Sequence, residues 1–165
     1  MRPIEFRAWD ETEKRWLNID EFFIFYDGTI FLVTWLDDSV YDDAVTLDRA
    51  GEDIKLEQYT GLKDKKGNRI FDGDIVRIDS LEVFNLTSNY NDTPVRGSCI
   101  SEVKIIEGHT YVWLTPIIDG KKIRYGARLL LKGLSKYISR NVATGSVEVI
   151  GNIHDNPELL GGAAE

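Results

Sequence analysis

The stretch from Tyr59 to Ile78 limits the possible folds more than any other part of this 165-residue chain. Gly67-Asn68 and Gly73 stand between strand-like runs, and Gly and Asn are the residues that most readily adopt positive φ. We therefore predict two tight turns, at Gly67-Asn68 and at Gly73, that lead into a strand at residues 74–78. The stretch favours a mostly β fold.

The same stretch combines glycines with lysines, as phosphate-binding loops do. A P-loop, however, needs Lys and then Ser or Thr directly after its last glycine, and Gly67 is followed by Asn68 and Arg69. Asp72 and Asp74 flank Gly73, a spacing more typical of side chains that cap backbone amides than of an acid and base pair. We predict structural turns here and no catalytic or phosphate-binding role.

Alternating or β-branched runs predict further strands along the chain. Asp27-Gly28 is a favoured type I′ hairpin dipeptide. The preceding residues 21–26 fit either a short helix or a strand, and the dipeptide favours two paired strands. Apolar spacing within residues 128–140 predicts a short helix that begins near Leu134, because Gly133 weakens a longer one. The remaining predicted strands span residues 4–9, 29–35, 101–106, 110–114 and 147–150, with turns at residues 10–15, 107–109 and 119–120.

Two stretches lack a periodic pattern. Residues 37–53 are acidic and predict an exposed loop that carries short structure, and residues 85–98 predict a long polar loop or an insertion.

Charge is distributed unevenly. Residues 1–60 carry 15 Asp and Glu against 6 Lys and Arg, whereas residues 61–165 carry 13 against 14. The first part therefore has a net charge of −9, and an acidic lobe repels nucleic-acid phosphates. Direct nucleic-acid binding is disfavoured.

Cysteine content and hydropathy predict a cytoplasmic protein. Cys99 is the only cysteine, so no internal disulfide can form and stability must come from packing. No apolar run has the length of a signal peptide or of a membrane span, so we expect no membrane contact.

The chain has no recognisable metal or catalytic signature. Asp37, Asp38, Asp42 and Asp43 offer oxygen ligands, but their spacing does not fit an EF-hand, and a solvated acidic loop is favoured. His109 and His154 have no partner at zinc-ligand spacing, and Cys99 is expected to be a semi-buried thiol. We predict no cofactor, no metal and no catalytic residue.

Tryptophans in strand-like surroundings normally pack in a core, and a binding platform is the less common alternative. The candidate interaction surface predicted from the sequence consists of two tryptophans and the acidic loop: Trp35, Trp113, Asp37, Asp38, Asp42 and Asp43.

Three stretches form one pattern when taken together. They are Phe6-Arg7-Ala8-Trp9-Asp10, the run from Gln58 through Gly73-Asp74-Ile75-Val76, and Val149-Ile150-Gly151-Asn152-Ile153-His154-Asp155-Asn156-Pro157 with Glu158-Leu159-Leu160. In this order they resemble the YopX family of phage and prophage proteins. The resemblance implies an SH3-like β-barrel that begins at the Gly-Asp-Ile-Val strand, with a β-rich portion packed beside it. It implies no activity and no catalytic residue.

The expected organisation is an acidic β-rich portion at residues 1–57, an SH3-like barrel portion at 58–160 and a flexible tail at 161–165. The leading functional hypothesis is a non-enzymatic protein-binding or assembly module of a phage or prophage. Its partner would be a host or phage protein or a second copy of the chain. The alternatives are an acidic mimic of nucleic acid that occupies a host DNA-binding protein, and an unrecognised enzyme.

Overall fold

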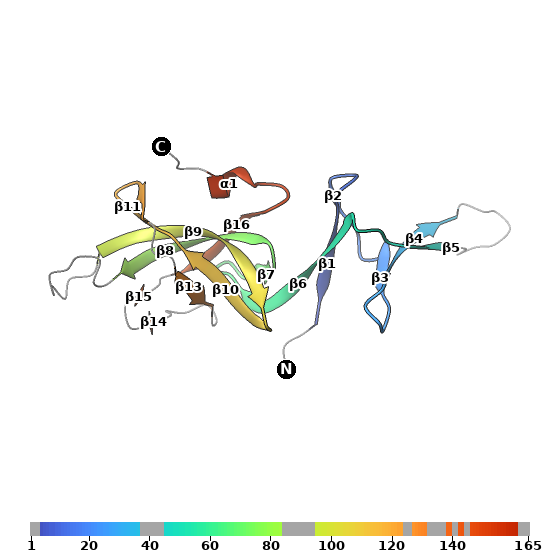
Figure 1. The fold of residues 1–165 in the computed structure, drawn as a ribbon, viewed down its shortest axis with the longest axis horizontal. Coiled ribbons are helices and arrows are strands. Elements are labelled where there is room, and N and C mark those ends of the chain that lie inside the picture. Colours follow the sequence, from blue (N-terminus) through green and yellow to red (C-terminus); the bar gives the residue numbers. More distant parts are fainter. Residues whose placement is uncertain are drawn as a thin grey trace. The chain divides into compact units, whose positions relative to one another are not determined.

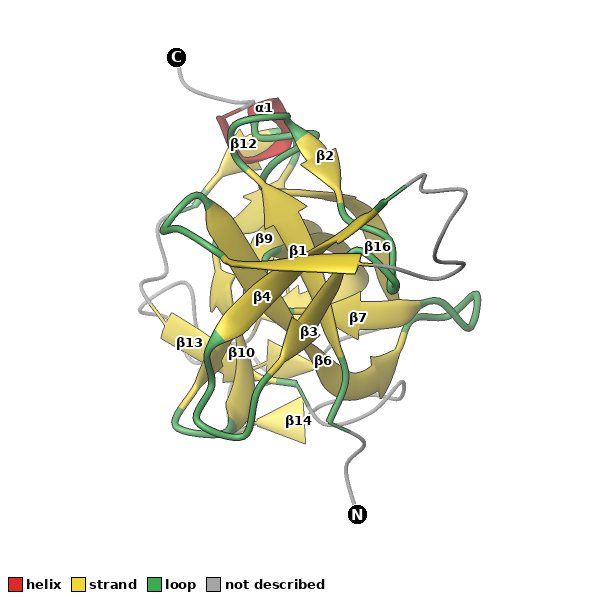
Figure 2. Cartoon of the chain, turned by 90° about the vertical axis from the view of Figure 1, so that its right-hand side faces the viewer, coloured by secondary structure: helices red, strands yellow, loops and turns green. Residues whose placement is uncertain are grey.

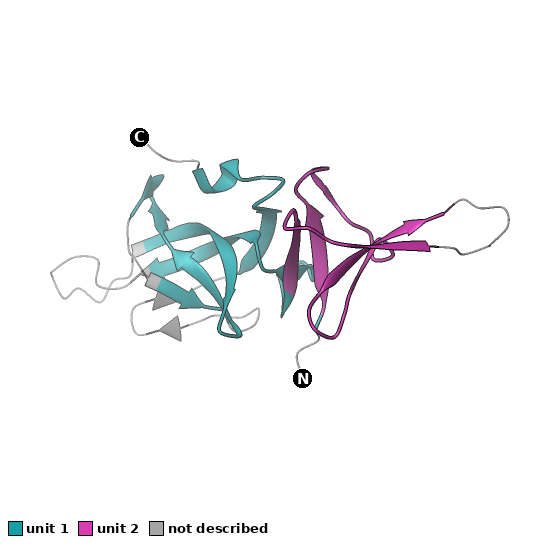
Figure 3. Ribbon diagram, turned by 45° about the vertical axis from the view of Figure 1, so that its right-hand side comes forward, with its two compact units in different colours: residues 1–4, 59–165 teal, residues 5–58 magenta. Residues whose placement is uncertain are grey.

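The computed structural model describes residues 4–36, 45–83, 95–123, 127–131, 138–139, 142–143 and 146–161. The chain divides into an N-terminal unit, residues 5–58, and a C-terminal unit, residues 1–4 and 59–165 (Figure 3). Every described element is a strand except one four-residue helix (Figure 2). The predicted mostly β class is confirmed.

The N-terminal unit contains five strands and the first part of a sixth. β1 pairs with both β2 and β6, and β3, β4 and β5 form a three-stranded antiparallel sheet in that order. The core of this unit contains Ala8, Phe22 and Ile54, with Leu32 packed against it. The strands are β1 (Phe6–Asp10), β2 (Arg15–Trp16), β3 (Phe22–Ile24), β4 (Ile30–Trp35), β5 (Val45–Arg49) and β6 (Ile54–Lys63).

The predicted hairpin between β3 and β4 is present. Of the two alternatives for residues 21–26, a short helix or a strand, the strand is therefore correct. The turn of this hairpin differs from the predicted type I′ turn. The Gly28 amide donates to the Phe25 carbonyl, the Phe25 amide donates to the Thr29 carbonyl, and only Gly28 has positive φ, at 86°. The loop is therefore three residues long and closes with a glycine bulge, because Asp27 stays outside the left-handed region.

The C-terminal unit holds the larger sheet (Figure 1). Strands follow the order β12-β11-β9-β8-β15-β14, β16 also pairs with β8, and β10 joins β9 to β13. One core lies against these strands and includes Ile78, Leu81, Val103, Val112 and Leu129. The elements are β7 (Arg69–Phe71), β8 (Asp74–Val83), β9 (Val95–Ile106), β10 (His109–Leu114), β11 (Pro116–Ile118), β12 (Lys121–Lys122), β13 (Ala127–Leu130), β14 (Ile138–Ser139), β15 (Val142–Ala143), β16 (Val147–Asn152) and α1 (Glu158–Gly161).

The short helix predicted from Leu134 does not extend to residues 138–139, and both described ends of the 128–140 segment are strands. Arg128 to Leu130 belong to β13, and Ile138–Ser139 form β14. Leu129 pairs with Val112 of β10 and is buried, so pairing across the sheet overrides a helical spacing of leucines. Residues 132–137, where the helix was expected to begin, lie outside the described residues.

Both predicted loops contain strand residues. Val45–Arg49 form the exposed strand β5, which is the short structure expected within the 37–53 loop, whereas residues 95–98 belong to β9 rather than to the predicted 85–98 insertion. β9 also passes close to β11 at Gly97, where a Cβ atom would lie 2.2 Å from the Ile117 carbonyl oxygen. Only glycine allows this approach.

Two other predicted turns are present and have the type I′ signature. Glu107 and Gly108 connect β9 to β10 with φ of 50° and 76°, and Asp119 and Gly120 connect β11 to β12 with φ of 49° and 76°. No helix in the described part of the chain is long and apolar enough to cross a membrane.

Candidate functional site

The turn after β6 is built around the buried carboxylate of Asp64. Its Oδ1 accepts the Lys66 and Asn68 amides, each at 2.8 Å, and its Oδ2 accepts Asn68 Nδ2 at 3.1 Å and the Val149 amide at 3.2 Å. Although burial opposes ionisation, these hydrogen bonds from Asn68 and the backbone hold the pKa of Asp64 below its ordinary value. Asp64 therefore fastens the turn to β16.

The predicted turns are confirmed in position. Gly67 and Gly73 have positive φ, at 88° and 81°. Asn68 was also expected to have positive φ, which is wrong, because its amide and side chain instead bond Asp64.

The two carboxylates around Gly73 bond backbone amides, as predicted. Asp74 Oδ2 accepts the Phe71 amide at 2.7 Å, and Asp72 Oδ1 accepts the Ile105 amide of β9 at 2.9 Å. The Gly73 amide donates to the Val103 carbonyl. This turn therefore joins β7, β8 and β9.

The lysines of the turn lie in an ion-pair cluster. Lys65 and Lys66 each approach a Glu148 carboxylate oxygen at 2.5 Å, and Lys65 also reaches Asp79. Hydrogen bonds from the two lysines lower the pKa of Glu148 to about 2. The amines that suggested a phosphate site are thus bound to carboxylates of the same unit.

Cys99 is fully buried, and its thiol donates to the Trp113 carbonyl at 3.6 Å. Burial raises the pKa of Cys99, whereas an activated nucleophile needs a lowered one. The sequence predicted a semi-buried thiol, and the structure buries Cys99 completely. His109 is the first residue of β10, and His154 follows β16 in a turn. No cluster of three or more His, Cys, Asp or Glu with metal-ligand geometry occurs among the described residues.

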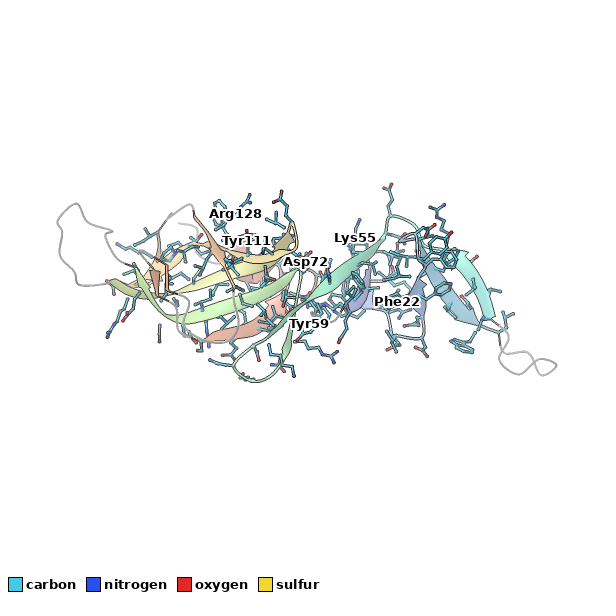
Figure 4. All side chains as sticks on the ribbon, turned by 90° about the horizontal axis from the view of Figure 1, so that it is seen from below. Phe22, Lys55, Tyr59, Asp72, Tyr111 and Arg128 are labelled. Carbon is cyan, nitrogen blue, oxygen red and sulfur yellow. The ribbon has the colours of Figure 1, made fainter. Side chains whose placement is uncertain are left out.

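A groove of about 280 Å³ lies along β9, β10 and β13 in the C-terminal unit. Trp113 lies directly opposite Arg128 on the neighbouring strand, and Tyr111 lies opposite Lys104. Figure 4 shows Tyr111 and Arg128 close to one another. The lining residues used below are Glu102, Lys104, Tyr111, Trp113, Lys122 and Arg128.

Two polar contacts hold the backbone around this groove. Lys122 Nζ donates to the Leu160 carbonyl of α1 at 3.1 Å, which joins β12 to the helix beside the groove. Ser101 Oγ accepts the Trp113 amide at 2.8 Å and so fixes the backbone beneath the indole. The Trp113 side chain is 50% exposed, so it is available to a ligand.

The N-terminal unit has a second exposed surface, the outer face of the β3–β4–β5 sheet. One side of this sheet packs into the core through Phe22 and Leu32. The opposite side carries stacked rings, with Phe23 and Phe31 centroids 5.2 Å apart. The outer face consists of Phe23, Phe31, Val33, Trp35, Val45, Leu47 and Arg49.

Aromatic and aliphatic side chains remain in contact with solvent on this outer face. Trp35 is 55% exposed, Leu47 is 50% exposed and Val45, opposite Trp35, is 38% exposed. Contiguous apolar surface of this kind is typical of interaction sites. Trp35 thus lies within an apolar face of one unit and Trp113 within a groove of the other.

A family model for YopX protein matches residues 5–161. The chain belongs to the YopX family. Among solved structures, the chain matches the crystal structure of protein EF1440 from Enterococcus faecalis, with 24% identity, a TM-score of 0.46, and coverage of 97% of this chain and 99% of that one. No curated protein matches.

The structure of this YopX family member includes surface residues that sequence reasoning missed. Lys104 and Arg128 join Trp113 only because three antiparallel strands place them in neighbouring rows, and alternation along residues 100–106 could have indicated the first. Leu47 was missed because the acidic residues near it in the sequence predicted a loop with no periodic pattern. Asp37, Asp38, Asp42 and Asp43 lie outside the described residues.

Proposed function

We propose that this YopX family member is a cytoplasmic phage or prophage protein that serves as a non-enzymatic protein-binding or assembly module. The observation that carries the proposal is the exposed edge of the N-terminal unit. β5 pairs with β4 and with no other strand in the described part of the chain, and all five of its residues are exposed. An unpaired edge with an apolar outer face is suited to adding a strand from another chain.

The simplest partner is a second copy. A two-fold axis perpendicular to the sheet would preserve its faces, so Leu47 would meet Leu47 of the second copy. Thr46 would then lie opposite Asp48, and no two like charges would face each other across the junction. The two outer faces would form one continuous apolar surface.

Size-exclusion chromatography with light scattering tests the self-association. We expect the full chain to be a dimer and Leu47→Lys to be monomeric, because two lysines would face each other at the axis. Ile19→Lys is the matched control, since Ile19 is 83% exposed and lies outside β3, β4 and β5. A monomeric wild-type chain, with no specific partner captured from infected cells, would refute the binding function.

An acidic mimic of nucleic acid is the second proposal, and the charge of the N-terminal unit supports it. Residues 5–58 hold 15 acidic and 5 basic residues, a net charge of −10. Neutralising Asp37, Asp38, Asp42 and Asp43 should then abolish capture of a host DNA-binding protein. Retained capture, or no such protein in the captured material, counts against the mimic.

We also propose that the C-terminal unit is an SH3-like barrel. Support comes from five antiparallel strands, β16, β8, β9, β10 and β13, paired in that order around one core. An experimental structure in which the sheet closes on itself would establish the barrel, and an open sheet would exclude it.

A further inference from the structure

The groove along β9, β10 and β13 has the opposite charge to the chain as a whole. Three cations, Lys104, Lys122 and Arg128, line it together with the single carboxylate of Glu102, whereas the whole chain carries −8. Lys104 pairs with Glu102, and Lys122 bonds the Leu160 carbonyl. Arg128 is exposed and has no ion pair or hydrogen bond to any described residue. One guanidinium is therefore available to an anion.

The aromatic rings determine what kind of anion fits. Trp113 lies beside Arg128 and Tyr111 beside Lys104, so two of the three cations have an amphipathic ring as cross-strand neighbour. A planar guanidinium binds a carboxylate through two parallel hydrogen bonds, and the rings offer apolar contact area. A carboxylate next to an apolar side chain satisfies both requirements.

We propose that this groove binds an acidic peptide segment of a partner protein, with one apolar side chain against Trp113 and Tyr111 and a carboxylate on Arg128. The groove's volume of about 280 Å³ is near the lower limit of small-ligand sites, so it accepts a short segment. A nucleic acid would need a longer basic stripe, which a chain of net charge −8 opposes. This site is separate from the β5 edge and does not depend on self-association.

Fluorescence anisotropy of the full-length chain with labelled peptides tests the proposal. The probes are short peptides of Asp and Glu with a central Leu, Phe or Tyr, and matched peptides in which Asn and Gln replace the acids. We expect the acidic set to bind and the neutral set to bind at least about tenfold more weakly. Amide chemical shifts should change along β10 and β13.

The matched variants are Arg128→Gln and Arg96→Gln. Both remove one exposed guanidinium, but Arg96 pairs with Glu82 and does not line this groove. Arg128→Gln should weaken acidic-peptide binding at least about tenfold, and Arg96→Gln should leave it unchanged. Trp113→Ala should also weaken it, while far-ultraviolet circular dichroism, to which the peptide backbone is the main contributor, shows that the fold is retained.

Four results would overturn the proposal. They are no binding of any acidic peptide at about 1 mM, equal binding of acidic and neutral peptides, equal loss in the two arginine variants, and tighter binding of a single-stranded oligonucleotide in the same groove. The two proposals can fail separately. If the wild-type chain is a dimer, Leu47→Lys is a monomer and the wild-type chain binds no acidic peptide, the groove site is refuted and the proposed function stands.

Discussion

Replacing Asp64 by Asn should destabilise the C-terminal unit strongly. The carboxylate is completely buried and accepts four hydrogen bonds, two on each oxygen. An amide nitrogen cannot accept, so Asp64→Asn loses at least two of them and leaves two donors facing an NH₂ group. At about 1.5 to 3 kcal/mol for each hydrogen bond to a charged group, the expected loss is roughly 3 to 6 kcal/mol.

Urea unfolding measures this loss. With a slope near 2 kcal/mol/M, the midpoint should fall by about 1.5 to 3 M. Hydrogen exchange should accelerate at Val76 and Ile78 of the C-terminal unit more than at Phe31 of the N-terminal unit. Asp27→Asn is the control, because Asp27 lies in the similar three-residue loop after β3 but is exposed and accepts one amide, that of Thr29.

The pH dependence separates this explanation from a loss of packing. The pKa of Asp64 is lowered in the folded chain, so its stabilisation is complete above an unfolded pKa of about 3.9 and is lost as the pH falls through the folded pKa. The difference between wild type and Asp64→Asn should therefore shrink below pH of about 4. A stability difference between wild type and Asp64→Asn that is small at neutral pH, or that does not shrink in acid, would show that the Asp64 carboxylate does not stabilise the fold through these hydrogen bonds.

Two further substitutions and one titration test single structural features. Gly97→Ala should lower the free energy of unfolding in urea by about 1 to 3 kcal/mol, because the new Cβ would clash with the Ile117 carbonyl. An unchanged midpoint would show that β11 can move away without loss of stability. Glu107→Asn should raise stability by about 0.5 to 1 kcal/mol, since Asn tolerates the φ of 50° in this type I′ turn better than Glu, and a lower midpoint would contradict that assignment. NMR titration of Glu148 should give a midpoint near pH 2, because Lys65 and Lys66 stabilise the carboxylate. The contribution of Glu148 to the stability of the fold is therefore complete above an unfolded pKa of about 4.3 and is lost as the pH falls through 2. A midpoint close to that of an exposed glutamate would rule out the ion-pair cluster in solution.

Local patterns predicted the local structure well. The turns at Gly67 and Gly73 and the hairpin at Glu107-Gly108 depend on neighbours in the sequence and are present. The strand predicted at residues 4–9 is also present, shifted to Phe6–Asp10. The turn at Asp27-Gly28 shows the limit of such patterns, because one dipeptide can close loops of two or three residues.

Features set by distant partners could not be predicted. The strand at residues 127–130 exists because β10 offers a partner edge, whereas the leucine spacing within 128–140 was only compatible with a helical face and predicted no strand. The groove combines Lys104, Trp113 and Arg128 from three strands, and no spacing within one segment reveals that arrangement. The terminal helix α1 was also missed, although Asn156-Pro157-Glu158 is a typical helix start.

The pairing of β8 with β16 has a consequence for synthesis of the chain. Ile78 pairs with Val147, 69 positions later, so β8 leaves the ribosome long before β16, its partner on this edge, exists. At roughly 5 to 20 residues per second, the interval is on the order of 3 to 14 s. During that time the nascent chain carries an open strand edge beside the apolar residues that will form the core. The turn anchored by Asp64 is complete early in this interval, and its Oδ2 then receives the Val149 amide only when the last strand arrives.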